Sequence, residues 1–421
     1  MNWSRRDLLK TAMAATAGPW LATYRSWAAP AEKTVKITAI RALQLDNVGD
    51  GCLIRIDTDA GIAGYGEAGC TARMARARLE QMERIWKGQD PLAIEHLFYL
   101  MTSPQNPFIP HVGLISGIDI ALWDLAGRIL GQPVYRLMGG PARPAAPIYA
   151  HGRVSNLLDE AQVRDWFQKT RDNPEGFRIF KFSAGTRERV REASGAEGVP
   201  ARGPWQPTAD GYDLRKVAKA YEILRKVVGS DFDIAMHGSG QFDLPTAVGM
   251  ARAIEPAEPA WFEDPLNFVY SEAWVHLKRS TRVPILTGEK VELVAGFRPY
   301  LDNGAVDILH PDPAYAGGIT GIRKIADYAA LSRVPVGLHS GPCSLIRFYA
   351  AVHLGGAIEN FFRIENALGE FRGFKEKMAL PGREPVIRNS AMALPSGPGL
   401  GLEINEEWIR QHVAKDEPYW G

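Results

Sequence analysis

The chain is poor in cysteine and close to electrically neutral. Its 421 residues include three cysteines, Cys52, Cys70 and Cys343, and such an odd, sparse set does not form a disulfide framework. The sequence leaves open whether Cys52 and Cys70 pair. Lys and Arg total 49 against 48 Asp and Glu, well mixed, for a net charge of +1. This balance gives no support for nucleic-acid binding or a polybasic membrane contact, so we expect a small-molecule partner.

Long apolar runs are also missing. The run that comes closest follows adjacent arginines in residues 4–10, and it is too short and too rich in Ala and Gly for a stable membrane span. A small-x-small cleavage site follows at residues 26–28. The pattern resembles a twin-arginine export signal over residues 1–30. It predicts a periplasmic or secreted mature chain without membrane contact; the alternative is a disordered basic N-terminus.

The second half of the chain carries six ionisable residues at nearly constant spacing. Successive gaps between them are 26, 26, 23, 27 and 26 residues, and each residue lies close behind a short apolar run of strand type. One strand, one helix and two short loops need about 25 residues. Repetition of that unit predicts an α/β fold, a TIM-type barrel, in which the carboxyl ends of parallel strands converge on one mouth. The six residues are His237, Glu263, Glu289, Asp312, His339 and Glu365.

Two domains are predicted around this pattern. Residues 35–67 alternate in strand fashion and residues 71–131 have helical periodicity, so we expect an N-terminal α+β capping domain over residues 35–140. A Pro-rich linker leads into the barrel, which is predicted over residues 145–384. The C-terminal segment 385–421 is expected to return to the capping domain.

Three of the six residues suit a divalent cation. His237, Glu263 and Glu289 come from consecutive predicted strands, so imidazole and carboxylate ligands converge at the mouth. Two glutamates at neighbouring strand ends repel each other, and a bound cation relieves that repulsion. The alternative is three buried polar residues satisfied by their neighbours. We predict one divalent metal ion per subunit.

The remaining residues are suited to moving a proton. A carboxylate beside an imidazole fixes its tautomer and raises its basicity, which makes His339, paired with Asp312, a candidate general base. Glu365, crowded by other acids, is expected to stay protonated and to donate to a developing oxyanion. Lys181, on the second predicted barrel strand, offers a cation to a substrate carboxylate. Together they indicate removal of a proton next to a carboxylate. The alternatives are a hydrogen bond that only stabilises the fold and a solvated lysine.

Six local motifs carry a resemblance to a known family. They are SGIDIALWDLAGRILGQPVYRLMGG (116–140), WFEDP (261–265), TGE (287–289), HPDPAYAGGITG (310–321), GLHSG (337–341) and PSGPGLGLEI (395–404). From residue 35 to about residue 405 the chain resembles the enolase superfamily, mandelate racemase/muconate lactonizing enzyme subgroup, and is nearest to its acid-sugar dehydratases. The resemblance implies a modified (β/α)7β barrel, Mg²⁺ and a homo-oligomer. It also implies that Glu263 and Glu289 ligate the metal, that Asp312–His339 is the base and that Glu365 is the electrophilic acid.

Two positions depart from the family pattern. His237 stands where the first metal ligand is usually Asp, which lowers the formal charge of the site from −3 to −2 and makes Mn²⁺, Fe²⁺ and Zn²⁺ candidates beside Mg²⁺. The second barrel strand reads Lys181-Phe182-Ser183, without the second lysine that racemases of the subgroup use as a base on the other face. This favours a one-base elimination, in which His339 takes the α-proton and a β-hydroxyl leaves.

The source of the proton for the leaving hydroxyl stays open in the sequence. Ser239 stands where several dehydratases have a histidine acid, and serine is a poor acid. Either His339 returns its proton or another group, such as His151, supplies one. The predicted substrate-binding residues are Lys181, Ser183, Ser239, His151 and Arg153.

The sequence therefore predicts a metal-dependent dehydratase that converts a sugar acid, aldonate-like or aldarate-like, into a 2-keto-3-deoxy acid. One alternative is a cycloisomerase or epimerase of a sugar acid or lactone that uses the same enediolate. The other is a metal-bound sugar-acid-binding protein without turnover. Loss of the α-proton into D₂O without a 2-keto product distinguishes the first alternative, and tight binding without exchange distinguishes the second.

Overall fold

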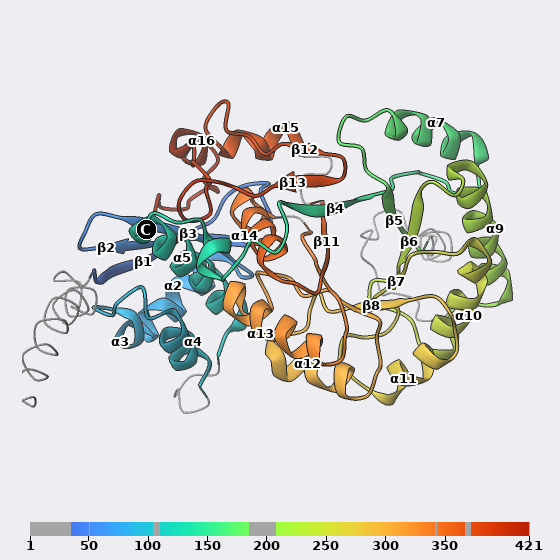
Figure 1. Ribbon diagram of the computed structural model, residues 1–421, viewed down its shortest axis with the longest axis horizontal. Coiled ribbons are helices and arrows are strands. Elements are labelled where there is room, and N and C mark those ends of the chain that lie inside the picture. The colour runs from blue at the N-terminus through green and yellow to red at the C-terminus, as the bar shows by residue number, and fades with distance from the viewer. Residues whose placement is uncertain are drawn as a thin grey trace, which may run out of the picture.

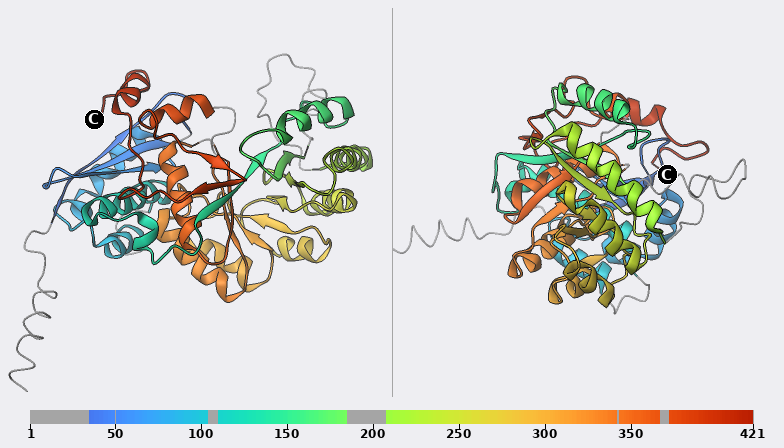
Figure 2. Two further views of the ribbon diagram at one scale, coloured as in Figure 1. Left: turned by 45° about the horizontal axis from the view of Figure 1, so that its top comes forward. Right: turned by 90° about the vertical axis from the view of Figure 1, so that its right-hand side faces the viewer.

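The structure contains an N-terminal α+β domain beside a closed barrel. It is a computed structural model that describes residues 35–49, 51–103, 110–184, 208–341, 343–366 and 372–420. The predicted export signal, residues 1–30, lies outside the described residues. Figures 1 and 2 show the first domain in blue to teal and the barrel in green to orange. None of the helices in the described ranges is long and apolar enough to cross a membrane.

The capping domain is a three-stranded antiparallel sheet packed on helices, as predicted. Strands β1 (Ile37–Leu43), β2 (Cys52–Thr58) and β3 (Ala63–Ala68) pair in chain order. Helix α5 (Val112–Leu130) lies against β3 and is buried from Val112 to Gly127. The shorter helices of the domain are α2 (Ala72–Gln81), α3 (Glu83–Trp86), α4 (Ile94–Thr102) and α6 (Val134–Leu137).

Glycine allows α5 to approach the sheet closely. A Cβ atom on Gly66 of β3 would lie 2.0 Å from the carbonyl oxygen of Gly117, so a side chain at this position would push the helix away. The same helix ends at Gly131, whose φ of 65° lies in the left-handed region that favours glycine. The sequence thus fixes both the contact and the end of α5.

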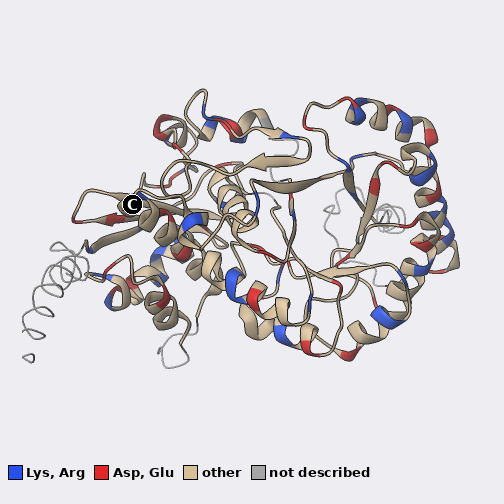
Figure 3. Cartoon of the chain, in the orientation of Figure 1, with Lys and Arg blue, Asp and Glu red and all other residues tan. Residues whose placement is uncertain are grey.

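The barrel is closed and parallel. Its strands are hydrogen-bonded in chain order, and β11 pairs with β4 to close the ring. The strands are β4 (Ala145–His151), β5 (Ile179–Ser183), β6 (Asp233–His237), β7 (Phe262–Glu263), β8 (Ile285–Thr287), β9 (Ile308–Leu309), β10 (Val336–Leu338) and β11 (Phe361–Glu365). The helices outside them are α7 (Glu160–Arg171), α9 (Gly211–Val228), α10 (Leu244–Ile254), α11 (Glu272–Arg279), α12 (Leu293–Asp302), α13 (Gly318–Leu331) and α14 (Leu345–Ala357). Figure 3 shows both signs of charge on these outer helices.

A small apolar cluster fills the inside of the barrel below the mouth. It comprises Tyr149, Ile179, Ala235, Trp261, Leu286 and Ile308. Side chains two residues apart on a strand point to the same face. Ile179, Ala235 and Trp261 each precede a predicted site residue by two positions, so those site residues also point inward, one layer higher. The apolar cluster therefore closes the barrel beneath the polar mouth.

The C-terminal segment divides between the two domains. Strands β12 (Ile387–Arg388) and β13 (Ala391–Ala393) pair with each other, and β13 runs antiparallel to β4 of the barrel. Contacts with the capping domain begin near Gly399, whose carbonyl accepts a hydrogen bond from the amide of Val134. The predicted boundary at residue 385 is therefore too early, because the first part of the segment extends the barrel sheet. The remaining elements are α15 (Arg372–Lys375), the 3-10 turn Glu376–Met378 and α16 (Glu406–Gln411).

The three cysteines are buried thiols in this structure. Cys52 lies in β2 and Cys70 follows β3, and their side chains are hydrogen-bonded to each other. The two strands that carry them are paired, which explains why residues 18 positions apart in the chain are neighbours. Cys343 precedes α14 and is fully buried.

Candidate active site

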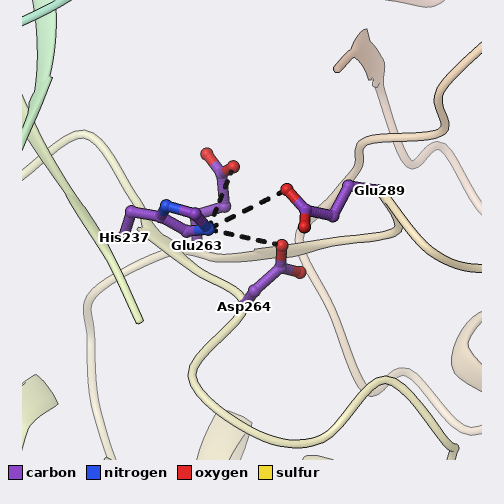
Figure 4. A group of neighbouring side chains, drawn as sticks. All are labelled: His237, Glu263, Asp264 and Glu289. Carbon is purple, nitrogen blue, oxygen red and sulfur yellow. Dashed lines mark ion pairs between the residues drawn. The ribbon is translucent and has the colours of Figure 1, made fainter. Parts of the chain in front are cut away.

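The three predicted metal ligands meet at the mouth of the barrel. His237 ends β6 and Glu263 ends β7, and the two residues are direct partners in the register of these strands. Glu289 follows β8 by two residues. One ligand atom from each, together with one from Asp264, lies within 4.8 Å of all the others. Figure 4 shows the four side chains pointing toward one another.

Asp264 is a member of this group that the sequence reasoning missed. Alternation along a strand would turn it away from Glu263, but its φ of 44° breaks the alternation and brings both side chains to the same side. Thr287 Oγ1 donates to its Oδ1 at 2.6 Å, which leaves Oδ2 directed at the cluster. The sequence did contain a sign of this ligand, because Asp264 is a second acidic residue directly between the strand-end glutamate and Pro265.

The geometry and chemistry of these residues fit a divalent cation. Nε2 of His237 lies 3.8 Å from Oε1 of Glu263 and 3.8 Å from Oδ2 of Asp264. It lies 3.9 Å from Oε2 of Glu289. Nε2 of His237 and Oδ2 of Asp264 are buried without a hydrogen-bond partner, a costly state that a shared cation would relieve. One imidazole nitrogen among carboxylate oxygens is a donor set for Mg²⁺, Mn²⁺, Fe²⁺ or Zn²⁺.

Asp264 also corrects the charge argument made from the sequence. With a neutral His237, the four residues carry three carboxylates, so the formal charge is −3 rather than −2. The reduced charge is therefore no reason to favour Mn²⁺, Fe²⁺ or Zn²⁺ over Mg²⁺. The imidazole ligand remains the only reason among these residues for such a preference.

His339 and Asp312 form the predicted pair. His339 directly follows β10, and its Nδ1 donates to Oδ2 of Asp312 at 2.6 Å. Because Nδ1 carries the proton, Nε2 is the basic nitrogen, and it lies 3.2 Å from Oε2 of Glu289 and 3.4 Å from Oε2 of Glu365. Burial lowers the pKa of His339, but the charges of Glu365, Glu289 and Asp312 outweigh it and raise the pKa to about 9. A cation bound beside Glu289 would lower this pKa again and so free Nε2 to accept a proton.

Asp312 is held by barrel residues, one of which also contacts the capping domain. Its Oδ1 accepts hydrogen bonds from the amide of Ala314 at 2.6 Å and from Nη1 of Arg347 at 3.3 Å. Arg347 lies in α14, is almost fully buried, and its Nε lies 3.5 Å from Oε1 of Glu67 in β3 of the capping domain. Sequence reasoning missed Arg347 and Glu67. Neither the helix nor the edge strand that carries them has a sequence feature showing that the charged residue will be buried between the domains.

Lys181 lies between two carboxylates rather than free at the mouth. Its Nζ lies 2.7 Å from Oε1 of Glu263 and 2.8 Å from Oε1 of Glu365, and its side chain is 2% exposed. Burial lowers its pKa, but the two glutamates more than offset this and raise the pKa above its usual range. This burial excludes the alternative of a solvated lysine. The ammonium group of Lys181 neutralises Glu263 and Glu365 and is therefore already paired before any substrate binds.

Glu365 is ionised, contrary to the prediction. Burial raises its pKa, but Lys181, His339 and His151 lower it by more, so the pKa lies well below the usual range. The carboxylate accepts hydrogen bonds from the amide of Ser340 at 3.1 Å and from Nε2 of His151. The prediction was wrong because it counted the neighbouring acids and overlooked three basic groups that converge on the same carboxylate.

The predicted substrate-binding residues lie at the ends of β4, β5 and β6. Ser183 is exposed and pairs in register with His237, and Ser239 follows β6 in a left-handed conformation with φ of 60°. His151 ends β4 with its side chain 36% exposed, and Arg153 lies in the exposed segment after it. These positions border the mouth, and their roles in binding remain predictions.

His310 is a further buried residue beneath the mouth. Its Nε2 lies 3.2 Å from the hydroxyl of Tyr149, and its Nδ1 lies 3.6 Å from Oε1 of Glu263. Burial lowers the pKa of His310 to about 4, so the ring is neutral at physiological pH.

Both domains match family models. Residues 38–139 match the family described as mandelate racemase/muconate lactonizing enzyme, N-terminal domain. Residues 162–408 match the family described as enolase C-terminal domain-like. The two matches cover the capping domain and nearly all of the barrel.

Curated relatives and solved structures agree with these matches. The chain is 30% identical over 383 residues to D-gluconate dehydratase of Thermoproteus tenax, which covers 87% of this chain and 72% of the relative. It is 30% identical over 396 residues to D-xylonate dehydratase of Haloferax volcanii, with 91% and 90% covered. A mandelate racemase/muconate lactonizing enzyme-like protein from Rubrobacter xylanophilus superposes with a TM-score of 0.81 at 28% identity, covering 92% of this chain and 100% of that one. The chain therefore belongs to the enolase superfamily, in its mandelate racemase/muconate lactonizing enzyme subgroup.

Proposed function

We propose that this enzyme is a metal-dependent sugar-acid dehydratase that produces a 2-keto-3-deoxy acid. The observation that carries the proposal is the position of the base. Nε2 of His339 points into the mouth and lies 3.2 Å from Glu289, a member of the candidate metal cluster. A substrate carboxylate bound at that cluster would present its α-carbon to His339.

The chemistry requires charge stabilisation next to a base. A proton α to a carboxylate is very weakly acidic, because its removal places a second negative charge on that carboxylate. When bound by His237, Glu263, Asp264 and Glu289, a divalent cation supplies Lewis-acid stabilisation of that charge. The residues fit such an ion, and by family resemblance it is Mg²⁺, with Mn²⁺, Fe²⁺ and Zn²⁺ as the alternatives.

The protein's own groups then perform the proton transfer. His339 takes the α-proton on Nε2, while its Nδ1 hydrogen bond to Asp312 fixes the tautomer and the ring orientation. Lys181 offsets the repulsion between Glu263 and Glu365 and holds both carboxylates in position. The apolar layer that includes Trp261 closes the barrel below and limits access of water from that side.

Elimination is favoured over epimerisation by the second barrel strand. Ser183 stands at the end of β5, and it is not a base that could return a proton on the opposite face. A single base that takes the α-proton leads to loss of the β-hydroxyl instead. The names of the relatives, D-gluconate, D-xylonate and D-galactonate dehydratase, support this reaction class.

The proposal is tested with a panel of aldonic and aldaric acids that includes D-gluconate, D-xylonate and D-galactonate. The metal is removed by chelation and returned as Mg²⁺, Mn²⁺, Fe²⁺ or Zn²⁺ before each assay. We expect a 2-keto acid from at least one substrate, in a metal-dependent manner. Exchange of the α-proton in D₂O without a 2-keto acid from any substrate would instead identify an epimerase or cycloisomerase.

A further inference from the structure

The departure of the β-hydroxyl needs a proton, and this step rests on the proposed dehydratase function. Hydroxide is a poor leaving group, so a positioned acid near the breaking carbon–oxygen bond gives a typical gain of about 10²–10⁴-fold. The acid must be reachable by substrate and able to exchange protons. Several groups at or beneath the mouth can be compared on these two criteria.

Most of the described candidates fail one criterion. Lys181 is 2% exposed and ion-paired to two carboxylates, so its proton is held tightly. His310 is 1% exposed, and its Nε2 contacts Tyr149 rather than the mouth. His237 directs its Nε2 at the metal cluster. The hydroxyl of Ser239 is too weak an acid at neutral pH.

His151 meets both criteria. It ends β4, its side chain is 36% exposed, and its Nε2 is hydrogen-bonded to Oε1 of Glu365. The other oxygen of the same carboxylate, Oε2, lies 3.4 Å from Nε2 of His339. The strands concerned, β10, β11 and β4, are consecutive in the barrel, so Glu365 stands between two imidazoles that both face the mouth.

We propose that His151 is the general acid that protonates the leaving β-hydroxyl. His339 takes the α-proton on Nε2, and the electron pair of the broken carbon–hydrogen bond forms the carbon–carbon double bond. The bond between the β-carbon and its hydroxyl breaks, and the imidazolium of His151 turns its Nε2 proton from Oε1 of Glu365 to the hydroxyl, which leaves as water while the ring becomes a neutral imidazole. The product leaves as an enol, which becomes the 2-keto-3-deoxy acid by moving a proton from oxygen to carbon.

Glu365 provides a path that restores both histidines. After the reaction His339 holds one extra proton and His151 lacks one. The carboxylate contacts Nε2 of His339 through Oε2 and Nε2 of His151 through Oε1, so it can accept the proton on one side and pass one on from the other. No proton is gained or lost by the enzyme over a cycle. The position of Glu365 between the two imidazoles assigns it a relay role.

The variant His151→Gln tests the assignment. The amide nitrogen of Gln can still donate to Glu365 but cannot deliver a proton, so the geometry is kept while the acid is removed. His339→Asn is the comparison variant, because Asn retains the contact made by Nδ1 and loses the basic Nε2. His276→Asn, on the exposed side of α11, controls for the loss of a histidine elsewhere. Each metal-loaded protein is incubated with substrate in D₂O and scored for 2-keto acid and for deuterium at the α-carbon of recovered substrate.

We expect His151→Gln to form 2-keto acid about 10²-fold or more slowly while recovered substrate gains α-deuterium. His339→Asn should lose both signals, and His276→Asn should keep the wild-type rate. In a substrate analogue with fluorine in place of the β-hydroxyl, fluoride leaves with less help from an acid. The elimination rate of His151→Gln should therefore fall far less with this analogue than with the natural substrate. The assignment is overturned if His151→Gln dehydrates at the wild-type rate, or if it loses exchange and both eliminations equally. If the wild-type protein forms no 2-keto acid from any substrate, the dehydratase function fails and the acid assignment fails with it.

Discussion

Two regions of this molecule contain buried carboxylates whose surroundings differ. At the mouth, Glu263 and Glu365 share the cation of Lys181, and Asp312 has Arg347 and His339. In α5 of the capping domain, Asp119 and Asp124 are equally buried. Backbone amides donate to both, and Asp124 also pairs with Arg128, whose side chain is partly exposed. The first arrangement keeps the acids charged, whereas the second raises their pKa. Burial alone therefore does not decide the charge of an acid; the partners do. The mouth concentrates charge for chemistry, and α5 uses its acids to hold the fold together.

The largest expected effect is at the mouth. His339→Asn should lower kcat by about 10³-fold or more, because it removes the base while Asn keeps the contact to Asp312. Substrate affinity and the melting temperature should change little. The measurement is steady-state kinetics with thermal unfolding of the same preparation. A variant with normal kcat would remove His339 from the mechanism.

A substitution in the metal cluster should also lower activity without lowering the stability of the metal-free protein. In Glu289→Gln, a carboxylate that faces His237 and His339 becomes neutral. We expect activity to fall by at least about 10²-fold, because a metal ligand is weakened. Metal added to the wild-type protein should raise its melting temperature by mass action, and this increase should be smaller or absent in the variant. The metal-free variant should be as stable as the metal-free wild type or more so. An equal metal-induced shift in both proteins would contradict the ligand assignment.

In α5 we expect the opposite result, a loss of stability with activity unchanged. Oδ1 of Asp124 accepts from the amide of Leu400 at 2.8 Å, and Oδ2 accepts from the amide of Tyr65 at 2.9 Å and from Nε of Arg128 at 2.8 Å. In Asp124→Asn, either orientation of the amide places an NH₂ group against a donor. We expect a loss of about 2–4 kcal/mol in the free energy of unfolding, with kcat of the folded protein unchanged. Denaturant unfolding at neutral pH measures it, and a variant as stable as wild type would refute the argument.

Asp119 is the matched control for Asp124. Its Oδ2 accepts from the amide of Thr320 at 2.9 Å, but its Oδ1 has no hydrogen-bond partner, so Asn can turn its NH₂ group to that side. Burial raises the pKa of Asp119 to about 7, against the partly opposing hydrogen bonds of Thr320. A raised pKa means that the folded state binds the proton more tightly, so this stability is complete below about pH 4 and is lost as the pH rises through 7.

Asp119→Asn should therefore be more stable than wild type at pH 8, by an amount on the order of 1–2 kcal/mol. The difference should shrink toward pH 5, where the wild-type carboxyl is protonated in the folded state. Denaturant unfolding of both proteins across this pH range measures it. A difference that stays constant with pH would show that Asp119 does not titrate in the folded protein.

The sequence predicted the barrel and the mouth because both depend on local, repeated signals. Each of the six residues stands at the end of a short apolar strand, and closure of the barrel brings those ends together without further information. Asp264 escaped the prediction because a single backbone angle decides which way it points. The charge of Glu365 was predicted wrongly because it depends on Lys181 and His151, which reach it only in three dimensions.

The contacts between domains were beyond sequence reasoning for a related reason. Arg347 and Glu67 are 280 residues apart in the chain and look like ordinary charges on a helix and a strand. Their burial is set by how the capping domain docks on the barrel. The segment from residue 387 to residue 393 likewise has strand character, but nothing local says that its partner is β4 rather than the first sheet.

The contact of Arg347 with both Glu67 and Asp312 has a consequence for how the protein becomes active. One end of the guanidinium group is anchored by the first domain to be synthesised, and the other orients the carboxylate behind the catalytic imidazole. A barrel that has folded without the capping domain would keep the contact between Arg347 and Asp312 but would lose the contact with Glu67 that holds the guanidinium group in place. We therefore expect the base to be fully aligned only once the two domains have docked.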